Sequence, residues 1–314
     1  MKFGLQHPNF TFDGPGKEIF GTLRTRAQSA EEYGFHSFWV MDHFHQLELS
    51  TFGKVDEPML EGWTTISALA GVTKTIKLGT LVTGNIYRSP ALLAKMGATV
   101  DVLSGGRLFM GVGAGWNEEE SRAYGIPHYD VPERLRRLGE ALQIIRGMWT
   151  SDGFSFNGRY YSTSNAFCVP KPVQKPHPPI LIGGSGEKST LRLVAKYGNA
   201  CNLFGGAATV RHKLAVLKEH CKSVGRDYDE ILKTKLGHLV IAEDAKDAKS
   251  IAVGEVSSPE RLEEYAVYGS PDLVKEKIRE FHEAGIEYMI FNVHAKREET
   301  MVKLFADEVI SSFS

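Results

Sequence analysis

The dipeptide Asp42-His43 follows the apolar run 37–41 and pairs a carboxylate with an imidazole. A strand that ends on two titratable side chains presents them at one edge of a sheet, where a ligand can reach them. Histidine changes its charge near neutral pH and therefore suits proton transfer, and an adjacent carboxylate can orient the imidazole or hold its charge. A purely structural histidine is the competing interpretation, and the pattern in the rest of the chain favours the functional one.

A glycine-rich turn is the second candidate for chemistry. Gly183, Gly184, Ser185 and Gly186 follow the apolar run 179–182 and lead into a helix predicted to begin near Glu187. Glycines let backbone N–H groups face an anion, and a helix N-terminus adds positive partial charge. We therefore expect a phosphate cradle here. A strand-to-helix turn that binds nothing is the alternative, and the missing Gly-Lys-Ser/Thr ending excludes a P-loop.

A third glycine pattern, Gly111-Val112-Gly113-Ala114-Gly115, also follows a predicted strand. Its G-x-G-x-G spacing and the acidic residues behind it do not fit a dinucleotide-binding turn. These glycines instead give a flat ring room to approach the backbone. Trp116 is either a packed hydrophobe or a wall against such a ring. Glu118, Glu119 and Glu120 are expected to form a solvated helix start that complements the helix dipole.

Composition excludes several other classes of function. The formal net charge is −1, which favours neither nucleic acid nor an anionic membrane as partner. The cysteines Cys168, Cys201 and Cys221 are far apart and form neither a disulfide framework nor a metal-ligand spacing, which is typical of a reducing compartment. The histidines also lack metal-ligand partners at a useful spacing, so we expect no metal. No serine lies in a nucleophile elbow, which argues against hydrolase chemistry.

The elements that must position these residues alternate between short apolar runs and helix-length amphipathic segments. Eight strand–helix pairs favour a (β/α)8 TIM barrel with a buried parallel sheet, and an open doubly wound sheet is the alternative. The predicted strands are 2–7, 37–43, 77–84, 107–113, 180–184, 200–205, 232–242 and 287–294. The predicted helices are 16–33, 61–73, 90–103, 132–150, 187–198, 207–224, 271–284 and 297–313.

Three segments exceed the bare eightfold unit and are predicted to be insertions after strands 2, 4 and 7. They are a polar loop at 44–60, a hairpin-like and proline-rich segment at 152–179, and a charged segment of short helices at 243–270. We expect the first two to lie near the mouth of the barrel. No linker interrupts the chain, so residues 1–314 are interpreted as one domain. With neither a signal peptide nor a membrane-length apolar run, a cytoplasmic protein is expected.

In their order along the chain, the motifs resemble the bacterial luciferase-like monooxygenase superfamily, in particular its branch that uses the deazaflavin coenzyme F420. The similarity covers nearly the whole chain. The motifs that carry it are Trp39-Val40-Met41-Asp42-His43-Phe44, Leu78-Gly79-Thr80-Leu81-Val82-Thr83, Tyr87-Arg88-Ser89-Pro90, Gly105-Gly106-Arg107, 111–118, Ala123-Tyr124-Gly125-Ile126-Pro127, 179–186 and Gly269-Ser270-Pro271.

The resemblance implies a barrel with its cofactor at the mouth, a small-molecule substrate and a homodimer. It also implies a non-proline cis peptide within Leu81-Val82-Thr83 that supports the back of the cofactor ring, with Gly113 and Asn117 as further contacts. His43 would then donate or accept the proton, with Asp42 beside the ring.

The cofactor assignment has an ordinary-flavin alternative. Coenzyme F420 is the first expectation, because the Asp-His exit of strand two is similar to that of the deazaflavin users. FMN, or a flavin-binding barrel without turnover, remains the alternative. Sugar-phosphate dehydrogenases of this branch place a catalytic glutamate where this chain has Trp116, which argues against a sugar-phosphate substrate.

Overall fold

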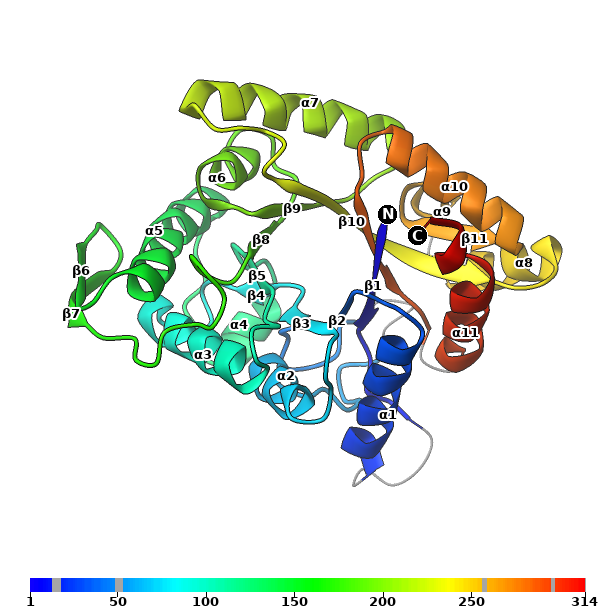
Figure 1. Ribbon diagram of the computed structural model, residues 1–314, viewed down its shortest axis with the longest axis horizontal. Coiled ribbons are helices and arrows are strands. Elements are labelled where there is room, and N and C mark those ends of the chain that lie inside the picture. Colours follow the sequence, from blue (N-terminus) through cyan, green and yellow to red (C-terminus); the bar gives the residue numbers. More distant parts are fainter. Residues whose placement is uncertain (13–17, 49–52, 256–258, 295–296, 314) are drawn as a thin grey trace.

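The computed structural model describes residues 1–12, 18–48, 53–255, 259–294 and 297–313. A parallel sheet curves around a central axis and helices surround it, as Figure 1 shows. The hydrogen-bonded path is β3-β2-β1-β12-β10-β9-β8-β5-β4. A parallel bridge joins Leu78 on the first strand of this path to Leu108, two residues before the start of β5, and so closes the ring. The predicted (β/α)8 barrel is therefore confirmed.

Eight wall positions make up the barrel, and β3 and β4 together form one of them. The wall strands are β1 Lys2–His7, β2 Ser37–Val40, β3 Lys77–Thr80, β4 Thr83–Gly84, β5 Met110–Gly113, β8 Ile180–Gly183, β9 Ala200–Leu203, β10 Leu232–Ile241 and β12 Tyr288–Asn292. The short strand β11, Ala266–Gly269, pairs with the far half of β10. The hairpin consists of β6 Phe154–Asn157 and β7 Ser162–Ala166.

The predicted helices begin and end close to their expected limits, and three further helices, at 118–123, 245–255 and 259–265, had no predicted limits. The helices are α1 Ile19–Glu32, α2 Gly62–Ala70, α3 Pro90–Leu103, α4 Glu118–Ala123, α5 Val131–Thr150, α6 Thr190–Tyr197, α7 Ala207–Val224, α8 Ala245–Glu255, α9 Pro259–Tyr265, α10 Pro271–Glu283 and α11 Glu298–Glu308, followed by the 3-10 turn Ile310–Phe313. Local sequence sets several starts. Asp130 caps α5 by accepting from Glu133 N–H at 2.7 Å, and Pro90 opens α3 where no backbone donor is needed.

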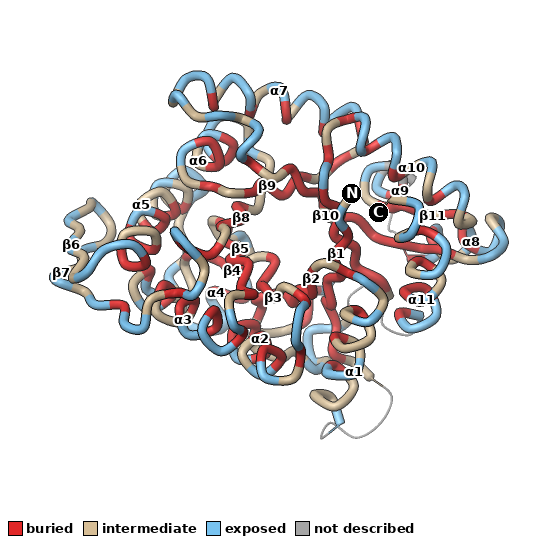
Figure 2. Tube along the Cα trace, viewed as in Figure 1, coloured by how far each residue is buried: buried red, intermediate tan, exposed pale blue. Residues whose placement is uncertain are grey.

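The strands of the barrel are buried, whereas the outer surface of the surrounding helices is exposed. Figure 2 shows buried strands around the axis and helices whose outward faces are exposed. The main core lies between the wall and the helices and includes Phe38, Trp63 and Trp149. A smaller cluster inside the barrel, with Trp39 and Tyr288, closes its floor. Within the described ranges, no helix combines the length and apolar character needed to cross a bilayer.

The third wall position is interrupted within Leu81-Val82-Thr83, where the family resemblance implies a cis peptide. The Leu81-Val82 bond is cis and joins β3 to β4. Leu81 N–H still donates to Val40 O at 2.9 Å, so the segment stays attached to β2. The predicted continuous strand 77–84 is therefore two short strands around this bond.

The insertions differ from expectation in two respects. In 152–179, the hairpin lies outside α5 (Figure 1), because a segment that follows a helix starts at the opposite end of the barrel from the mouth. No residue of 152–179 lines the large cavity described below. The segment 243–270 contains β11 as well as helices, and Glu255, Arg261 and Tyr265 from it do line that cavity. Residues 49–52 and 256–258 lie outside the described ranges.

Candidate functional site

A cavity of about 910 Å³ opens at the carboxyl ends of the barrel strands. Ligand pockets of this volume are typical for drug-sized molecules and cofactors. The structure brings most of the predicted site residues to its walls. Those that line it are His43, Leu81, Val82, Gly113, Gly183, Gly184, Ser185 and Gly186.

Asp42, Thr83 and Asn117 do not line the cavity. Each is held by another residue. Thr83 Oγ1 accepts from Trp63 Nε1 at 2.7 Å and lies 2.8 Å from Thr80 Oγ1. Asn117 caps α4, where its Oδ1 accepts from Glu120 N–H at 3.1 Å. These side chains therefore support the residues that face the cavity.

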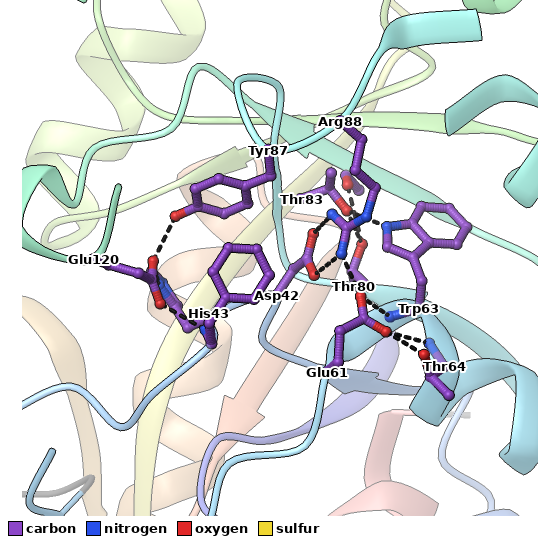
Figure 3. Close-up of polar contacts among 12 residues, drawn as sticks. Asp42, His43, Glu61, Trp63, Thr64, Thr80, Thr83, Tyr87, Arg88 and Glu120 are labelled. Atoms are coloured by element: carbon purple, nitrogen blue, oxygen red, sulfur yellow. Dashed lines mark hydrogen bonds and ion pairs between the residues drawn. The ribbon is translucent and has the colours of Figure 1, made fainter. Parts of the chain in front are cut away.

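His43 is oriented by a carboxylate far along the chain. Its Nδ1 lies 2.8 Å from Oε2 of Glu120, and both side chains appear in Figure 3. Tyr87 Oη donates to the same Oε2 at 2.6 Å, and Phe44 N–H donates to Oε1 at 2.6 Å. With Nδ1 engaged, Nε2 is the ring nitrogen available to a ligand in the cavity. The edge of Trp116 packs against the imidazole with a centroid distance of 5.7 Å.

Glu120 corrects one expectation. Its carboxylate is fully buried, whereas its neighbours Glu118 and Glu119 are exposed as predicted. Burial alone would raise the pKa of Glu120, but the hydrogen bond and charge of His43, with the donors Tyr87 and Phe44, hold that pKa below its ordinary value. Burial and the same carboxylate raise the pKa of Tyr87, which keeps the phenol protonated as a donor.

Asp42 belongs to a second buried cluster beside the first (Figure 3). Arg88 binds it in a bidentate pair, with Nη1–Oδ2 and Nη2–Oδ1 distances of 2.6 and 2.9 Å, and also contacts Glu61. Burial raises the pKa of Asp42, and the guanidinium opposes that shift. The structure therefore places the Asp42 carboxylate on Arg88, not beside a ring in the cavity. Glu61 in turn caps α2 by accepting from Thr64 N–H at 2.6 Å.

Glycines form the wall behind Val82. A Cβ built on Gly113 would lie 2.9 Å from Val82 Cγ2, and one built on Gly183 would lie 2.9 Å from both Val82 methyl groups. Real Cβ atoms essentially never approach that closely. Only glycine lets strands β5 and β8 approach the bulge at the cis bond Leu81-Val82 this closely and leaves no side chain on that part of the cavity wall. This arrangement fits a planar ring.

The turn 183–186 lies at the same mouth. Gly184 has a φ of +110°, which L side chains rarely adopt, so the turn requires glycine there. The following helix α6 begins at Thr190 instead of near Glu187. Gly186 O accepts from Leu191 N–H at 3.0 Å, so the turn leads directly into the first turn of that helix. Thr190 also lines the cavity.

A second histidine lies on another wall of the cavity, in a chain of directional hydrogen bonds. Gln6 Nε2 donates to Leu81 O at 2.9 Å, and Gln6 Oε1 then accepts from Asn292 Nδ2 at 3.5 Å. This orientation turns Asn292 Oδ1 toward His238 Nδ1, at 2.6 Å. His238 Nε2 lies 2.8 Å from Glu255 Oε2, so both ring nitrogens of His238 are engaged.

The two histidines therefore differ in what they can do. His43 keeps one ring nitrogen for a ligand, whereas His238 uses both on protein oxygens. Burial would raise the pKa of Glu255, but the hydrogen bond and charge of His238 lower it overall. Of these two histidines, His43 is the one whose Nε2 is not engaged by a protein oxygen within the described residues.

Four residues of the site were not predicted from the sequence: Glu120, Tyr87, His238 and Glu255. Tyr87 belongs to one of the family motifs, but no role was expected for it. Glu120 carried one usable signal, because it is the third residue after a capping asparagine, on the first turn of a short helix. His238 and Glu255 carried none, since their pairing joins a strand to an insertion. Among the described residues, no group of three or more His, Cys, Asp or Glu side chains is placed to hold a metal ion.

Comparison with known proteins gives a consistent family. The model of the luciferase-like monooxygenase family matches residues 1–258. An F420-dependent glucose-6-phosphate dehydrogenase of Amycolatopsis mediterranei is 29% identical, with 90% of this chain and 92% of that protein covered. An FMNH2-dependent dimethylsulfone monooxygenase of Pseudomonas putida is 37% identical over 52% of this chain and 43% of its own length. The solved structure of F420-dependent tetrahydromethanopterin reductase from Methanopyrus kandleri aligns with a TM-score of 0.82 at 20% identity, over 100% of this chain and 99% of that one.

Proposed function

Because the chain belongs to the luciferase-like monooxygenase family, we propose that it is an oxidoreductase that binds coenzyme F420 in the large cavity. It would transfer a hydride between the reduced deazaflavin and a small organic substrate. The observation that carries this proposal is the pairing of His43 with buried Glu120 in a cavity that Gly113 and Gly183 also line.

The residues present fit a deazaflavin or flavin. Gly113 and Gly183 leave a flat surface for the ring, and Leu81 and Val82 support it from the bulge. The turn 184–186, ahead of helix α6, would hold the phosphate through backbone N–H groups. When bound, the cofactor supplies the hydride, and the protein contributes binding, orientation and proton management.

His43 would donate or accept the proton. Its Nδ1–H donates to Glu120, which leaves a lone pair on Nε2 in the neutral imidazole and an N–H there in the imidazolium. Nε2 can therefore deliver a proton to a substrate oxygen as hydride reaches the carbon, or remove that proton in the reverse direction. Glu120 accepts from Nδ1–H and so fixes the direction of Nε2. The buried Arg88–Asp42 pair would act as scaffold beneath this residue pair.

A binding experiment distinguishes between F420 and FMN as the cofactor. The Asp-His exit of β2 supports the deazaflavin, while relatives of both kinds keep FMN as the second candidate. Titration with each cofactor, followed by absorbance, gives the two dissociation constants. The reduced form of the tighter cofactor is then offered a panel of aldehydes, ketones and enones. Tight FMN binding with no F420 binding rejects the proposal, and binding without turnover favours a storage barrel.

On the resemblance alone, we also propose a cytoplasmic homodimer of single-domain subunits. Light scattering of the purified full chain tests the dimer, and a monomeric mass at micromolar concentration rejects it. Limited proteolysis tests the single domain, since two stable fragments would indicate two domains.

A further inference from the structure

Trp116 is exposed at the mouth of the cavity, unlike every other tryptophan of the chain. Its exposed fraction is 59%, whereas Trp39, Trp63 and Trp149 are at most 2% exposed. Trp116 lines the cavity and touches the imidazole of His43. A large apolar side chain left in water beside a reactive group marks a surface that a ligand covers.

Other apolar residues continue this surface. Val131, 55% exposed, and Leu135 line the cavity from the first turns of α5, and Leu47 lines it from the loop after β2. We call Leu47, Trp116, Val131 and Leu135 the apolar wall. It offers hydrocarbon contact next to Nε2 of His43.

The charges beside the apolar wall do not favour an anion, and the other arginine that lines the cavity, Arg261, comes from α9 and not from the segments that form this wall. Arg134 lies between Val131 and Leu135 in sequence, but its guanidinium donates to Tyr129 O at 2.9 Å and to Gly115 O. Its charge is therefore directed at backbone carbonyls. Glu48, the exposed residue next to Leu47, places a carboxylate at the same mouth. A phosphate or carboxylate entering here would meet a like charge.

We propose that the apolar wall binds the hydrocarbon part of an uncharged substrate, and that Glu48 discriminates against anionic molecules. This inference rests on the proposed function and deepens it by naming the substrate class. The substrate is a neutral, mainly apolar compound with one carbonyl or hydroxyl group, which reaches His43 Nε2 while its carbon skeleton covers Trp116. A phosphorylated sugar has neither the apolar surface to cover the apolar wall nor a charge compatible with Glu48 beside it.

Because the other three tryptophans are buried, the fluorescence of Trp116 can report on what covers the apolar wall. Acrylamide quenches exposed tryptophans by collision, so in the full chain it should quench Trp116 and spare the three buried residues. The quenching constant is measured for the protein alone, with saturating cofactor, and with cofactor plus one of three probes. The probes are 2-decanone, decanoate and glucose 6-phosphate. The first two share their chain length and differ in charge.

We expect the concentration of 2-decanone that half-shields Trp116 from acrylamide to be at least about tenfold lower than that of decanoate. Glucose 6-phosphate should not shield Trp116. The inference is overturned if 2-decanone fails to shield Trp116, or if either anion shields it equally well. It is also overturned if the cofactor alone shields Trp116 completely, because the wall would then belong to the cofactor. Failure of the cofactor to bind, seen in its own absorbance, instead defeats the proposed function.

Three variants assign the signal. Trp116→Phe keeps an apolar ring and should abolish the quenchable emission, which identifies the reporter. Val131→Ser should weaken the shielding by 2-decanone about three- to tenfold, because the lost methyl contacts lie on the wall. Glu48→Gln should raise the affinity for decanoate and leave the affinity for 2-decanone unchanged. An unchanged decanoate affinity in Glu48→Gln contradicts the charge part of the inference. Thermal midpoints close to wild type confirm that these exposed positions leave the fold intact.

Discussion

His43 Nδ1 and Glu120 Oε2 lie 2.8 Å apart, although 77 residues separate them in the sequence. The carboxylate is fully buried and has two further donors, Tyr87 Oη and Phe44 N–H. Phe44 directly follows His43, so a single carboxylate fixes both the imidazole and the backbone that carries it. This relationship gives His43 one defined direction for its free nitrogen.

We expect His43→Ala to lower kcat by about 10²–10⁴-fold, the usual contribution of a positioned acid–base group. Affinity for the cofactor should change little, because the glycine wall and the turn 184–186 remain. Steady-state turnover of the reduced cofactor and an absorbance titration measure the two quantities. Full turnover at saturating cofactor and substrate would reject the role in proton transfer, whereas a loss confined to affinity would make His43 a binding contact.

Glu120→Gln tests the positioning role of the carboxylate. Glutamine has one acceptor oxygen where three donors now converge, so the imidazole loses either its partner or its tautomer. In a comparable catalytic pair the wrong tautomer costs about 10⁴-fold, and we expect a loss of about 10²–10⁴-fold in kcat with the cofactor affinity retained. Glu118→Gln makes the same change two residues away, on an exposed side chain paired with the exposed Arg122. Equal kcat values in the two variants would contradict the prediction.

Gly186→Val tests the phosphate turn more cleanly than a substitution of Gly184. At Gly184 any side chain is strained by the positive φ, so stability and binding would change together. At Gly186 an added Cβ would meet Thr190, with Oγ1 at 3.0 Å on a side chain that can rotate and Cβ at an ordinary contact distance of 3.7 Å. We expect cofactor affinity to fall at least about tenfold, with a thermal midpoint near that of wild type. Gly254→Val on α8, where the added Cβ meets open space, is the control.

The sequence predicted the barrel well because its signals are local. Strand periodicity, helix caps and prolines act over a few residues, and α3 and α7 coincide with their predicted ranges. The glycines that line the cavity were also predicted from the sequence. The structure gives the reason for Gly113 and Gly183, because a Cβ at either position would lie too close to Val82.

The partners of His43 and Asp42 could not be predicted in the same way. Asp42 was expected beside the cofactor because it is adjacent to His43. Side chains of neighbouring residues in extended backbone point apart, and the structure turns Asp42 toward Arg88. Glu120 was assigned to solvent because three successive glutamates at a helix start usually are solvated. Only the packing of α4 against the β2 loop shows that one of them is buried.

Arg88→Met should destabilise the protein by about 3–5 kcal/mol, because it leaves Asp42 as a buried charge without its partner. The Asp42 side chain is 0% exposed, so water cannot replace the guanidinium. Chemical denaturation at neutral pH measures the change. The double variant Arg88→Met/Asp42→Asn should recover part of the loss. Arg122→Met, which breaks an exposed pair with Glu118, should change the stability by about 0–1 kcal/mol. Equal effects of the two arginine variants would show that the buried cluster is not structural.

Lys235 is a buried lysine on the outer side of the barrel wall. Its Nζ lies 3.1 Å from Leu236 O, 3.4 Å from Glu264 O and 4.7 Å above the ring of Phe281. Burial lowers the pKa of Lys235 to about 7, with Lys277 adding to the effect and Glu264 opposing it. The ammonium form is thus less favourable in the folded chain than in the unfolded chain.

The sign of the pH dependence follows from proton binding. Between about pH 7 and 10.5 the unfolded chain keeps the Lys235 proton and the folded chain releases it, so the free energy of unfolding should rise with pH across this window. Below pH 7 the penalty is fully present. Lys235→Met should remove it and stabilise the protein at pH 7 by about 1–3 kcal/mol. Lys303→Met, on an exposed lysine paired with Asp307, should keep the wild-type dependence. Denaturation curves from pH 7 to 10 decide the matter: a Lys235→Met slope equal to that of wild type means that the buried amine does not titrate there.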